Sequence, residues 1–183
     1  SLRPASELFG GDAGLIPSQV TVEAYSNGWF GLQINFGQFF LNSLIIAVLA
    51  TIGNVLAASL VAYAFARLEF WGRSFWFALM LGTLMLPYHV TLIPQYVLFR
   101  SLDWVNTWWP LILPKYFAVD AFFVFLMVQF FRGIPKELDE AARMDGCSAW
   151  RIYWKIILPL SMPVLATAAI FSFIWTWEDF FGP

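Results

Sequence analysis

Charged residues are scarce in this sequence. Only 12% of its 183 residues are Asp, Glu, Lys or Arg, whereas a soluble domain carries about 25%. Hydrophobic residues make up 60% of the chain, and its mean hydropathy is +0.70. A composition this apolar predicts that lipid, and not water, surrounds most of the folded chain.

The residues that several kinds of chemistry require are also missing. Cys147 and His89 are the only residues of their types, which excludes an internal disulfide and a Cys/His metal site. A net charge of −2 without a basic cluster argues against nucleic acid as a partner. No Gly-x-x-x-x-Gly-Lys-Ser/Thr phosphate loop occurs, so this chain is not expected to hydrolyse ATP. We therefore predict a protein that is not an enzyme and has no catalytic residue, metal or cofactor of its own.

Long, mainly apolar runs make up more than half of the chain. A membrane-spanning helix needs about 20 predominantly apolar residues. Four runs approach or exceed this length, at 39–66, 75–99, 109–131 and 156–177, and the second is expected to be broken near Pro87. The sequence thus predicts an all-α, polytopic transmembrane helix bundle with about four spans, in a membrane domain from 39 to 183.

The first span carries small residues three or four positions apart, which lets helix backbones approach closely. They are Ala47, Ala50, Gly53 and Ala57, followed by Ala58, Ala62 and Ala66. This span is therefore predicted to pack inside a bundle. Asn42 and Asn54 need hydrogen-bond partners there, which we expect from a neighbouring helix or, for Asn42, from a transported substrate.

Residues 1–38 differ from the rest, because Gly and Pro interrupt them and no periodicity is sustained. They predict a loop-rich extramembrane segment with one short helix near 22–27. This segment is either a solvated connector or a docking surface for a soluble partner.

Seven of the ten Lys and Arg residues lie in the first and third connections between spans. Because these residues accumulate on the cytoplasmic side, those connections are predicted to be cytoplasmic and the N-terminal segment to lie outside.

Further polar residues in or beside the spans are candidates for a substrate pathway. Asp120 lies near the middle of the third span, where a carboxylate costs about 2.5–3.5 kcal/mol on insertion scales. It either lines a pathway or makes a structural hydrogen bond or ion pair. Trp175, Glu178 and Asp179 combine rings and carboxylates at the end of the fourth span. This mixture suits a sugar, and it is equally typical of a helix end at the membrane surface.

The largest charged island occupies residues 132–158, here called the charged segment. Pro135 and a group of acidic residues predict a helix start, and Gly146 predicts the end of that helix. Ser148 is expected to cap a second short helix. By spacing, one face of the first helix holds Leu138, Ala141, Ala142 and Asp145. We expect this flat alanine face to enter a groove on another protein.

The charged segment also resembles a known family. Glu140-Ala141-Ala142, three residues, Gly146, nine residues and then Ile156-x-Leu158-Pro159 is similar to the EAA loop of membrane subunits of ATP-binding-cassette importers. Further similarity lies in Phe40-Leu41-Asn42-Ser43-Leu44, Ala62-Tyr63-Ala64-Phe65-Ala66-Arg67, Val90-Thr91-Leu92-Ile93-Pro94, Gln129-Phe130-Phe131-Arg132 and Ile134-Pro135-Lys136-Glu137-Leu138. The chain resembles the carbohydrate type, in particular the shorter permease subunit of maltose and glycerol-3-phosphate importers. Glu178 is a departure, since relatives often have asparagine there.

The resemblance implies a permease subunit that moves a sugar or related polar solute across the plasma (inner) membrane of a bacterium or archaeon. ATP and Mg²⁺ would be bound by a partner, a dimer of cytoplasmic ATPase subunits. A second permease and an extracytoplasmic solute-binding protein would complete the importer. The residues that would contact the ATPase are Glu140, Ala141, Ala142, Arg143, Asp145 and Gly146.

Relatives of this kind have six spans, so we expect the chain to be a fragment lacking a first and a last span. The alternative function is a secondary transporter or channel subunit, for which Asp120 and His89 are the intramembrane candidates. A membrane enzyme is a third hypothesis, without a nucleophile–base set to support it.

Overall fold

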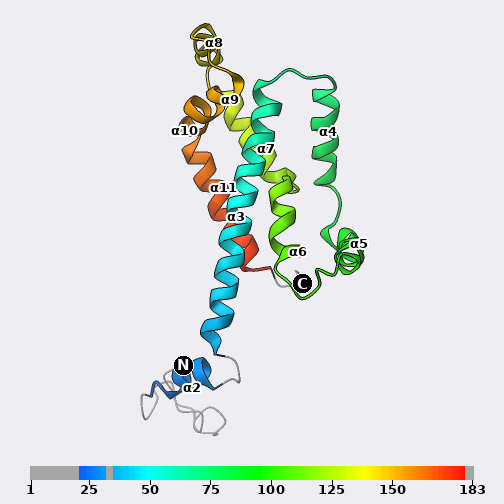
Figure 1. Ribbon diagram of the computed structural model, residues 1–183, viewed down its shortest axis with the longest axis vertical. Helices are drawn as coiled ribbons and strands as arrows, with labels where there is room; N and C mark the ends of the chain where they lie inside the picture. Colours follow the sequence, from blue (N-terminus) through cyan, green and yellow to red (C-terminus); the bar gives the residue numbers. More distant parts are fainter. Residues whose placement is uncertain (1–20, 32–34, 180–183) are drawn as a thin grey trace, which may run out of the picture. The chain divides into compact units, whose positions relative to one another are not determined.

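The computed structural model describes residues 21–31 and 35–179, and every regular element within these ranges is helical. This confirms the all-α prediction. Within the predicted N-terminal segment, 1–38, residues 1–20 and 32–34 lie outside the described residues. In chain order the elements are α2 (Glu23–Phe30), α3 (Phe36–Arg67), α4 (Arg73–Thr83), α5 (Tyr88–Ser101), α6 (Trp109–Ile112), η1 (Leu113–Phe117), α7 (Ala121–Gly133), α8 (Glu137–Met144), α9 (Ala149–Ile152), η2 (Tyr153–Ile157), α10 (Leu158–Leu160) and α11 (Met162–Trp177) (Figure 1).

The chain divides into two compact units, Ser1–Ile45 and Ile46–Pro183. In the first unit, α2 coincides with the short helix expected near 22–27. The rings of Trp29 and Phe36 lie 5.3 Å apart in this unit and join the end of α2 to the start of α3.

Two of the expected spans have the length and composition of a membrane span. Within the described residues, Phe36–Arg67 with 32 residues is one continuous helix, and Trp109–Gly133 with 25 residues is long and apolar enough but is divided into α6, η1 and α7. A third span is formed by Ala149–Leu160 and Met162–Trp177 if this pair, bent by 77°, is one broken span. The bend lies at Ser161, between α10 and α11. Each of these two helices carries a Pro in its first turn.

The predicted second span, 75–99, is not one continuous helix. It is divided into α4 with 11 residues and α5 with 14 residues, both shorter than a bilayer requires. The expected break near Pro87 is confirmed, because α5 begins directly after this extended residue. Proline is restricted in φ and lacks the backbone N–H that would continue the helix from α4.

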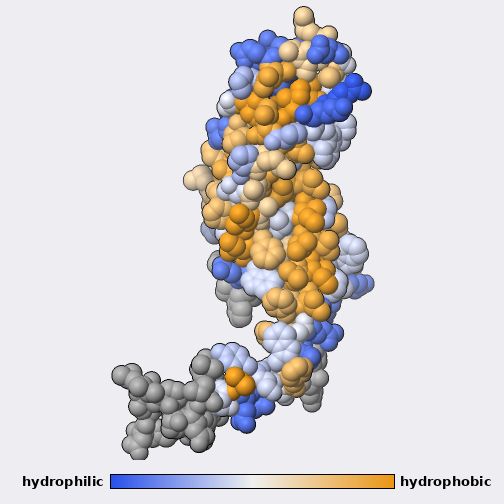
Figure 2. All heavy atoms as spheres, turned by 90° about the vertical axis from the view of Figure 1, so that its left-hand side faces the viewer, coloured by the Kyte–Doolittle hydropathy of each residue, from blue (hydrophilic) through white to orange (hydrophobic). Residues whose placement is uncertain are grey.

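The second unit is organised around the small-residue face of α3. Ala50, Ala58 and Ala62 are completely buried, whereas Val48 and Ile52 on the opposite face are 40% and 46% exposed. This distribution confirms that small residues mark the packed side of the helix, and it leaves large apolar side chains for lipid. Figure 2 shows apolar residues over the visible face of this unit and hydrophilic residues at the end that carries α8.

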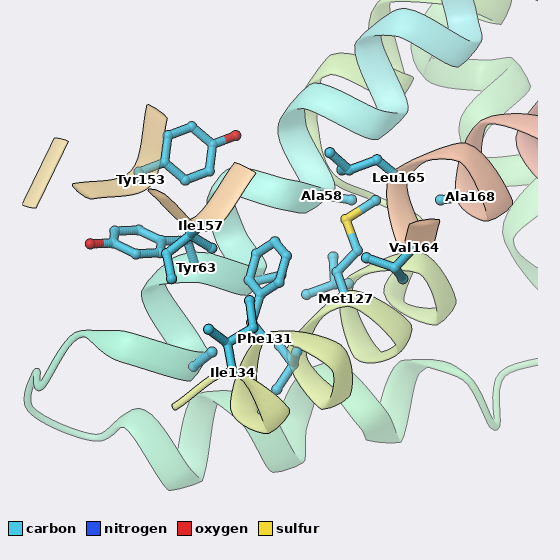
Figure 3. Packing of buried hydrophobic residues seen from close by; sticks show 14 of the residues in the cluster. Ala58, Tyr63, Met127, Phe131, Ile134, Tyr153, Ile157, Val164, Leu165 and Ala168 are labelled. Atoms are coloured by element: carbon cyan, nitrogen blue, oxygen red, sulfur yellow. The ribbon is translucent and has the colours of Figure 1, made fainter. Parts of the chain in front are cut away.

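The main core joins α3, α7, η2 and α11 (Figure 3). Phe123, Met127 and Phe131 of α7 are buried against the alanines of α3 and against Val164 of α11. Asn54 donates a hydrogen bond to Ser172 at 3.0 Å, so the partner expected from a neighbouring helix comes from α11. This core brings the C-terminal end of α3 beside the charged segment.

Gly53 of α3 lies against the ring of Tyr116 in η1. A methyl group there would overlap the ring of Tyr116. Gly53→Ala is therefore expected to lower the free energy of unfolding by about 1–3 kcal/mol, the usual cost of overpacking. Thermal unfolding of the protein in detergent, followed by fluorescence-detected size exclusion, measures this change.

Gly82 in α4 provides the matched control. A methyl group at this helical position meets no atom within 4 Å. Gly82→Ala is therefore expected to raise stability by about 0.5–1 kcal/mol through helix propensity. Equal stability of the two variants would show that Tyr116 does not restrict position 53.

Candidate functional site

The charged segment folds as the sequence predicts, with two short helices that meet at Gly146. Helix α8 has Glu137, Asp139 and Glu140 in its first turn, where carboxylates interact favourably with the helix dipole. Gly146 has φ = +78°, in the left-handed region that favours glycine. Its N–H bonds to the carbonyl of Arg143, and the N–H of Cys147 bonds to that of Ala142. The last carbonyls of α8 are thereby satisfied.

The second helix of the segment also begins as expected. The Ser148 hydroxyl accepts a hydrogen bond from the N–H of Arg151 at 3.4 Å and caps α9. The chain then continues through η2, a π-helix, into α10. Trp150 and Trp154 are 60% and 44% exposed beside this turn.

Five of the six residues predicted to contact a partner lie on the surface. These exposed residues are Glu140, Ala141, Arg143, Asp145 and Gly146. Ala142 is the exception, because it is only 6% exposed and belongs to the buried core cluster. The expectation of one flat alanine face is therefore corrected: Ala141 faces outward, and Ala142 packs inward. The small Ala142 side chain allows α8 to lie close against the core.

An ion pair that the sequence did not reveal holds α8 in place. Arg67 at the end of α3 lies 3.3 Å from the Asp139 carboxylate, and both side chains are less than a tenth exposed. The same guanidinium donates hydrogen bonds to the carbonyls of Phe131 and Ile134. Arginine suits this position because its rigid fork has five donors and remains charged when buried.

Two more contacts join α3 to the charged segment. The Tyr63 hydroxyl donates a hydrogen bond to the carbonyl of Ala149 at 2.9 Å. The hydroxyls of Ser59 and Tyr153 lie 2.7 Å apart and share a hydrogen bond. The rings of Tyr63 and Tyr153, with centroids 5.2 Å apart, lie beside each other in Figure 3.

The sequence of α3 indicates that one of its faces makes polar contacts. Ser59, Tyr63 and Arg67 are spaced by four residues, so they share one face of a helix that is otherwise lined by alanine. Polar groups on an apolar helix face need partners. The sequence does not indicate which segment supplies those partners, because they lie between 64 and 94 residues away along the chain.

Among the pathway candidates, Asp120 lies at the N-terminal end of α7 and pairs with Lys115 at 2.9 Å. Of its two predicted roles, the structural ion pair is the one observed. The two side chains are 30% and 29% exposed, and they join η1 to α7 across Ala118, which has φ = 53°. The carboxylate is thus paired at a break between helices.

The remaining candidates lie in two regions. Trp175 packs against Phe122 and Phe123 in the first turn of α7, with centroids 5.3 and 5.1 Å away. It therefore lies at the N-terminal end of α7, close in sequence to Asp120. Glu178 and Asp179 follow α11 and are exposed, while Asn42 is half-buried near the start of α3 in the first unit.

These features define a membrane protein with an exposed helix–glycine–helix segment attached to its bundle. Residues 54–183 match the family described as binding-protein-dependent transport system inner membrane component. The match covers well over half of the chain, so the chain belongs to this family. Its members are permeases, and the ATPase is a different protein.

Individual relatives agree with this assignment. A probable ABC transporter permease of Pyrococcus horikoshii is 37% identical over 99% of this chain and 66% of its own length. The arabinooligosaccharides transport system permease protein AraQ of Halalkalibacterium halodurans is 37% identical over 100% of this chain and 65% of its own length. The sn-glycerol-3-phosphate transport system permease protein UgpE of Yersinia pestis is 36% identical over 97% and 64%. The chain thus spans about two thirds of the length of these relatives.

A solved structure confirms the fold. It is that of a bacterial ABC transporter involved in the import of the acidic polysaccharide alginate. One of its chains superimposes with a TM-score of 0.85 at 25% identity, covering 97% of this chain and 61% of that chain. The helix bundle is therefore the permease fold of ABC importers.

Proposed function

We propose that this chain is the membrane-spanning part of an ATP-driven, binding-protein-dependent importer for a sugar or related polar solute. The observation that carries the proposal is the charged segment of a chain in this family. Its helix–Gly146–helix surface exposes Glu140, Ala141, Arg143 and Asp145, and buried contacts fix it to the bundle. A surface that is both exposed and firmly attached is suited to receive a mechanical displacement from another protein.

The partners in this proposal are a dimer of cytoplasmic ATPases, which bind ATP and Mg²⁺, a second permease subunit and an extracytoplasmic solute-binding protein. The charged segment lies on the cytoplasmic side, and the N-terminal segment lies outside. The placement of basic residues supports this orientation. Arg67, Arg132 and Lys136 lie at the end of the bundle that carries α8, because Arg67 contacts Phe131 and Ile134.

The solute class is proposed from the relatives and from the available side chains. Relatives include permease proteins of transport systems for arabinooligosaccharides and for sn-glycerol-3-phosphate. Trp175, Glu178 and Asp179 supply a ring and carboxylates, the groups that stack on sugars and bond to their hydroxyls. Asn42 is another proposed pathway residue, as is Asp120, whose ion pair with Lys115 leaves the carboxylate 29% exposed.

Reconstituted transport tests the proposed function. The full-length permease pair, its ATPases and its solute-binding protein are placed in liposomes with labelled oligosaccharides outside. Accumulation that requires ATP inside the vesicles, on the ATPase side, supports the proposal. Uptake that does not require ATP and is driven by a proton or sodium gradient would instead identify a secondary transporter.

Glu140→Lys tests the docking surface. Glu140 is exposed in the first turn of α8, so reversing its charge is expected to leave the fold within about 0.5 kcal/mol of wild type. Uptake is expected to fall to about a tenth or less, since truncating or reversing a central interface charge costs 2 kcal/mol or more, to order of magnitude. Vesicle uptake and ATPase pull-down measure transport and partner binding, and thermal unfolding in detergent measures stability.

Glu137→Lys is the matched control, because Glu137 is exposed in the same turn and lies outside the predicted contact. It should retain uptake. Normal uptake in Glu140→Lys, or an equal loss in both variants, would contradict a specific contact at Glu140.

A further inference from the structure

Helix α3 carries a polar stripe made of Ser59, Tyr63 and Arg67. The three residues are spaced by four and therefore lie along one side of the helix. They are 0%, 5% and 8% exposed, so they are buried even though each has a polar side chain. Burying such groups is unfavourable unless they form hydrogen bonds.

Every member of this polar stripe bonds to the chain around the charged segment. Ser59 contacts the Tyr153 hydroxyl in η2, and Tyr63 donates to the carbonyl of Ala149 in α9. Arg67 pairs with Asp139 in α8. The three contacts thus attach η2, α9 and α8, in that order, to successive turns of one helix.

Arg67 has the widest set of partners. Its guanidinium reaches the last turns of α7 at Phe131, the linker at Ile134 and the carboxylate of Asp139. It therefore joins three consecutive pieces of the chain to the end of α3. Removing this side chain would free both ends of the linker between α7 and α8.

Stability alone is a poor explanation for this arrangement. A buried ion pair is often no better for stability than apolar residues of similar volume, because both charges lose their hydration. What a charged pair with directional hydrogen bonds adds is a unique relative position of the elements that it joins. This property matters for a part that has to transmit movement.

We propose that the polar stripe makes the charged segment and the inner half of α3 move as one rigid body during transport. Arg67 and Asp139 are then positioning residues for coupling, and not part of the surface that a partner contacts. This inference rests on the proposed function, in which ATPases displace α8. The displacement would reach the small-residue core of the bundle directly through α3.

The test uses the complete importer with Arg67→Met and Asp139→Leu combined, which replaces the ion pair by apolar side chains. Solute carried per ATP hydrolysed is expected to fall about tenfold, within the usual range of coupling energies. Membrane insertion, ATPase binding and ATP hydrolysis should persist, because the exposed docking residues are unchanged. A purely structural role would reduce the amount of importer and leave solute per ATP at the wild-type value.

Two milder variants keep the test decisive if the double variant does not assemble. Tyr63→Phe removes one hydroxyl. Arg67→Lys keeps the charge, but its single ammonium cannot donate to the two carbonyls and lie beside the Asp139 carboxylate in the geometry of the guanidinium fork. Both should lower solute per ATP. Wild-type ratios in both would overturn the proposal. Absence of ATP-driven uptake in the wild-type importer would instead overturn the proposed function.

A distance measurement tests rigidity itself. Spin labels replace Met144 on α8 and Leu56 on α3, which are 89% and 40% exposed, in a Cys147→Ala background. In the importer with an intact polar stripe, the label separation should be the same with and without ATP. In the double variant it should change on ATP binding. A separation that already changes in the importer with the intact stripe would overturn the proposal.

Discussion

Gly146→Pro is expected to abolish ATP-driven uptake while the protein still inserts into the membrane. Gly146 has φ = +78°, whereas proline is restricted to about −65°. The turn between α8 and α9 would have to open, and the Gly146 N–H that bonds to the Arg143 carbonyl would be lost. The proline ring cannot adopt the positive φ that this turn requires. Vesicle uptake and membrane fractionation measure the two outcomes.

The control for this prediction is Gly146→Asn. A side chain at position 146 meets no atom within 4 Å, so the backbone angle is the restriction and space is not. Asparagine adopts the left-handed conformation more readily than other residues with a side chain. This variant should retain much more uptake than Gly146→Pro, although its side chain lies among the proposed contact residues. Loss of uptake to the same extent in both variants would mean that the helix–glycine–helix geometry is not what the Pro variant disrupts.

Ala142→Leu is expected to destabilise the protein and to stop uptake. Ala142 is buried against the core, so three extra carbon atoms must displace α8 or its neighbours. Overpacking of this kind costs about 1–3 kcal/mol. The displaced α8 would also strain the Arg67–Asp139 pair, since Asp139 lies one turn away on the same helix. Thermal unfolding in detergent and vesicle uptake are the measurements.

Ala141→Leu separates burial from docking. Ala141 is the neighbouring residue but is exposed, so the larger side chain should leave the unfolding temperature unchanged. Uptake should nevertheless fall, because the added side chain lies on the proposed contact with the ATPase. Equal unfolding temperatures for Ala142→Leu and Ala141→Leu would contradict the burial of the Ala142 side chain against the core.

Several features could be predicted because they depend on local chemistry. The caps of the charged segment are an example, since the glycine turn and the Ser148 cap are set by residues within five positions along the chain. The packed face of α3 is another, because lipid and protein are equally apolar and only small side chains permit close approach. The break at Pro87 follows from the proline ring itself.

Other features could not be predicted, because periodicity identifies a face and not its neighbour. The spacing placed Leu138, Ala141 and Ala142 together, yet the structure exposes the first two and buries the third. The cause is the position of the core, which is assembled from residues 58 to 168. In the same way, the sequence left Asp120 with two roles, and only folding brought the Lys115 ammonium to 2.9 Å from it.

By itself, the sequence determined that this is an all-helical membrane protein with a charged segment that resembles the EAA loop of importer permeases. Those properties follow from composition, the length of apolar runs and the spacing of a motif, all of which are local along the chain. Only the tertiary structure decided how the charged segment is held. Its attachment depends on Arg67 meeting Asp139, Phe131 and Ile134, which are 64 to 72 positions away. Contacts over such separations depend on the packing of α3 against α7, which the burial of apolar side chains stabilises.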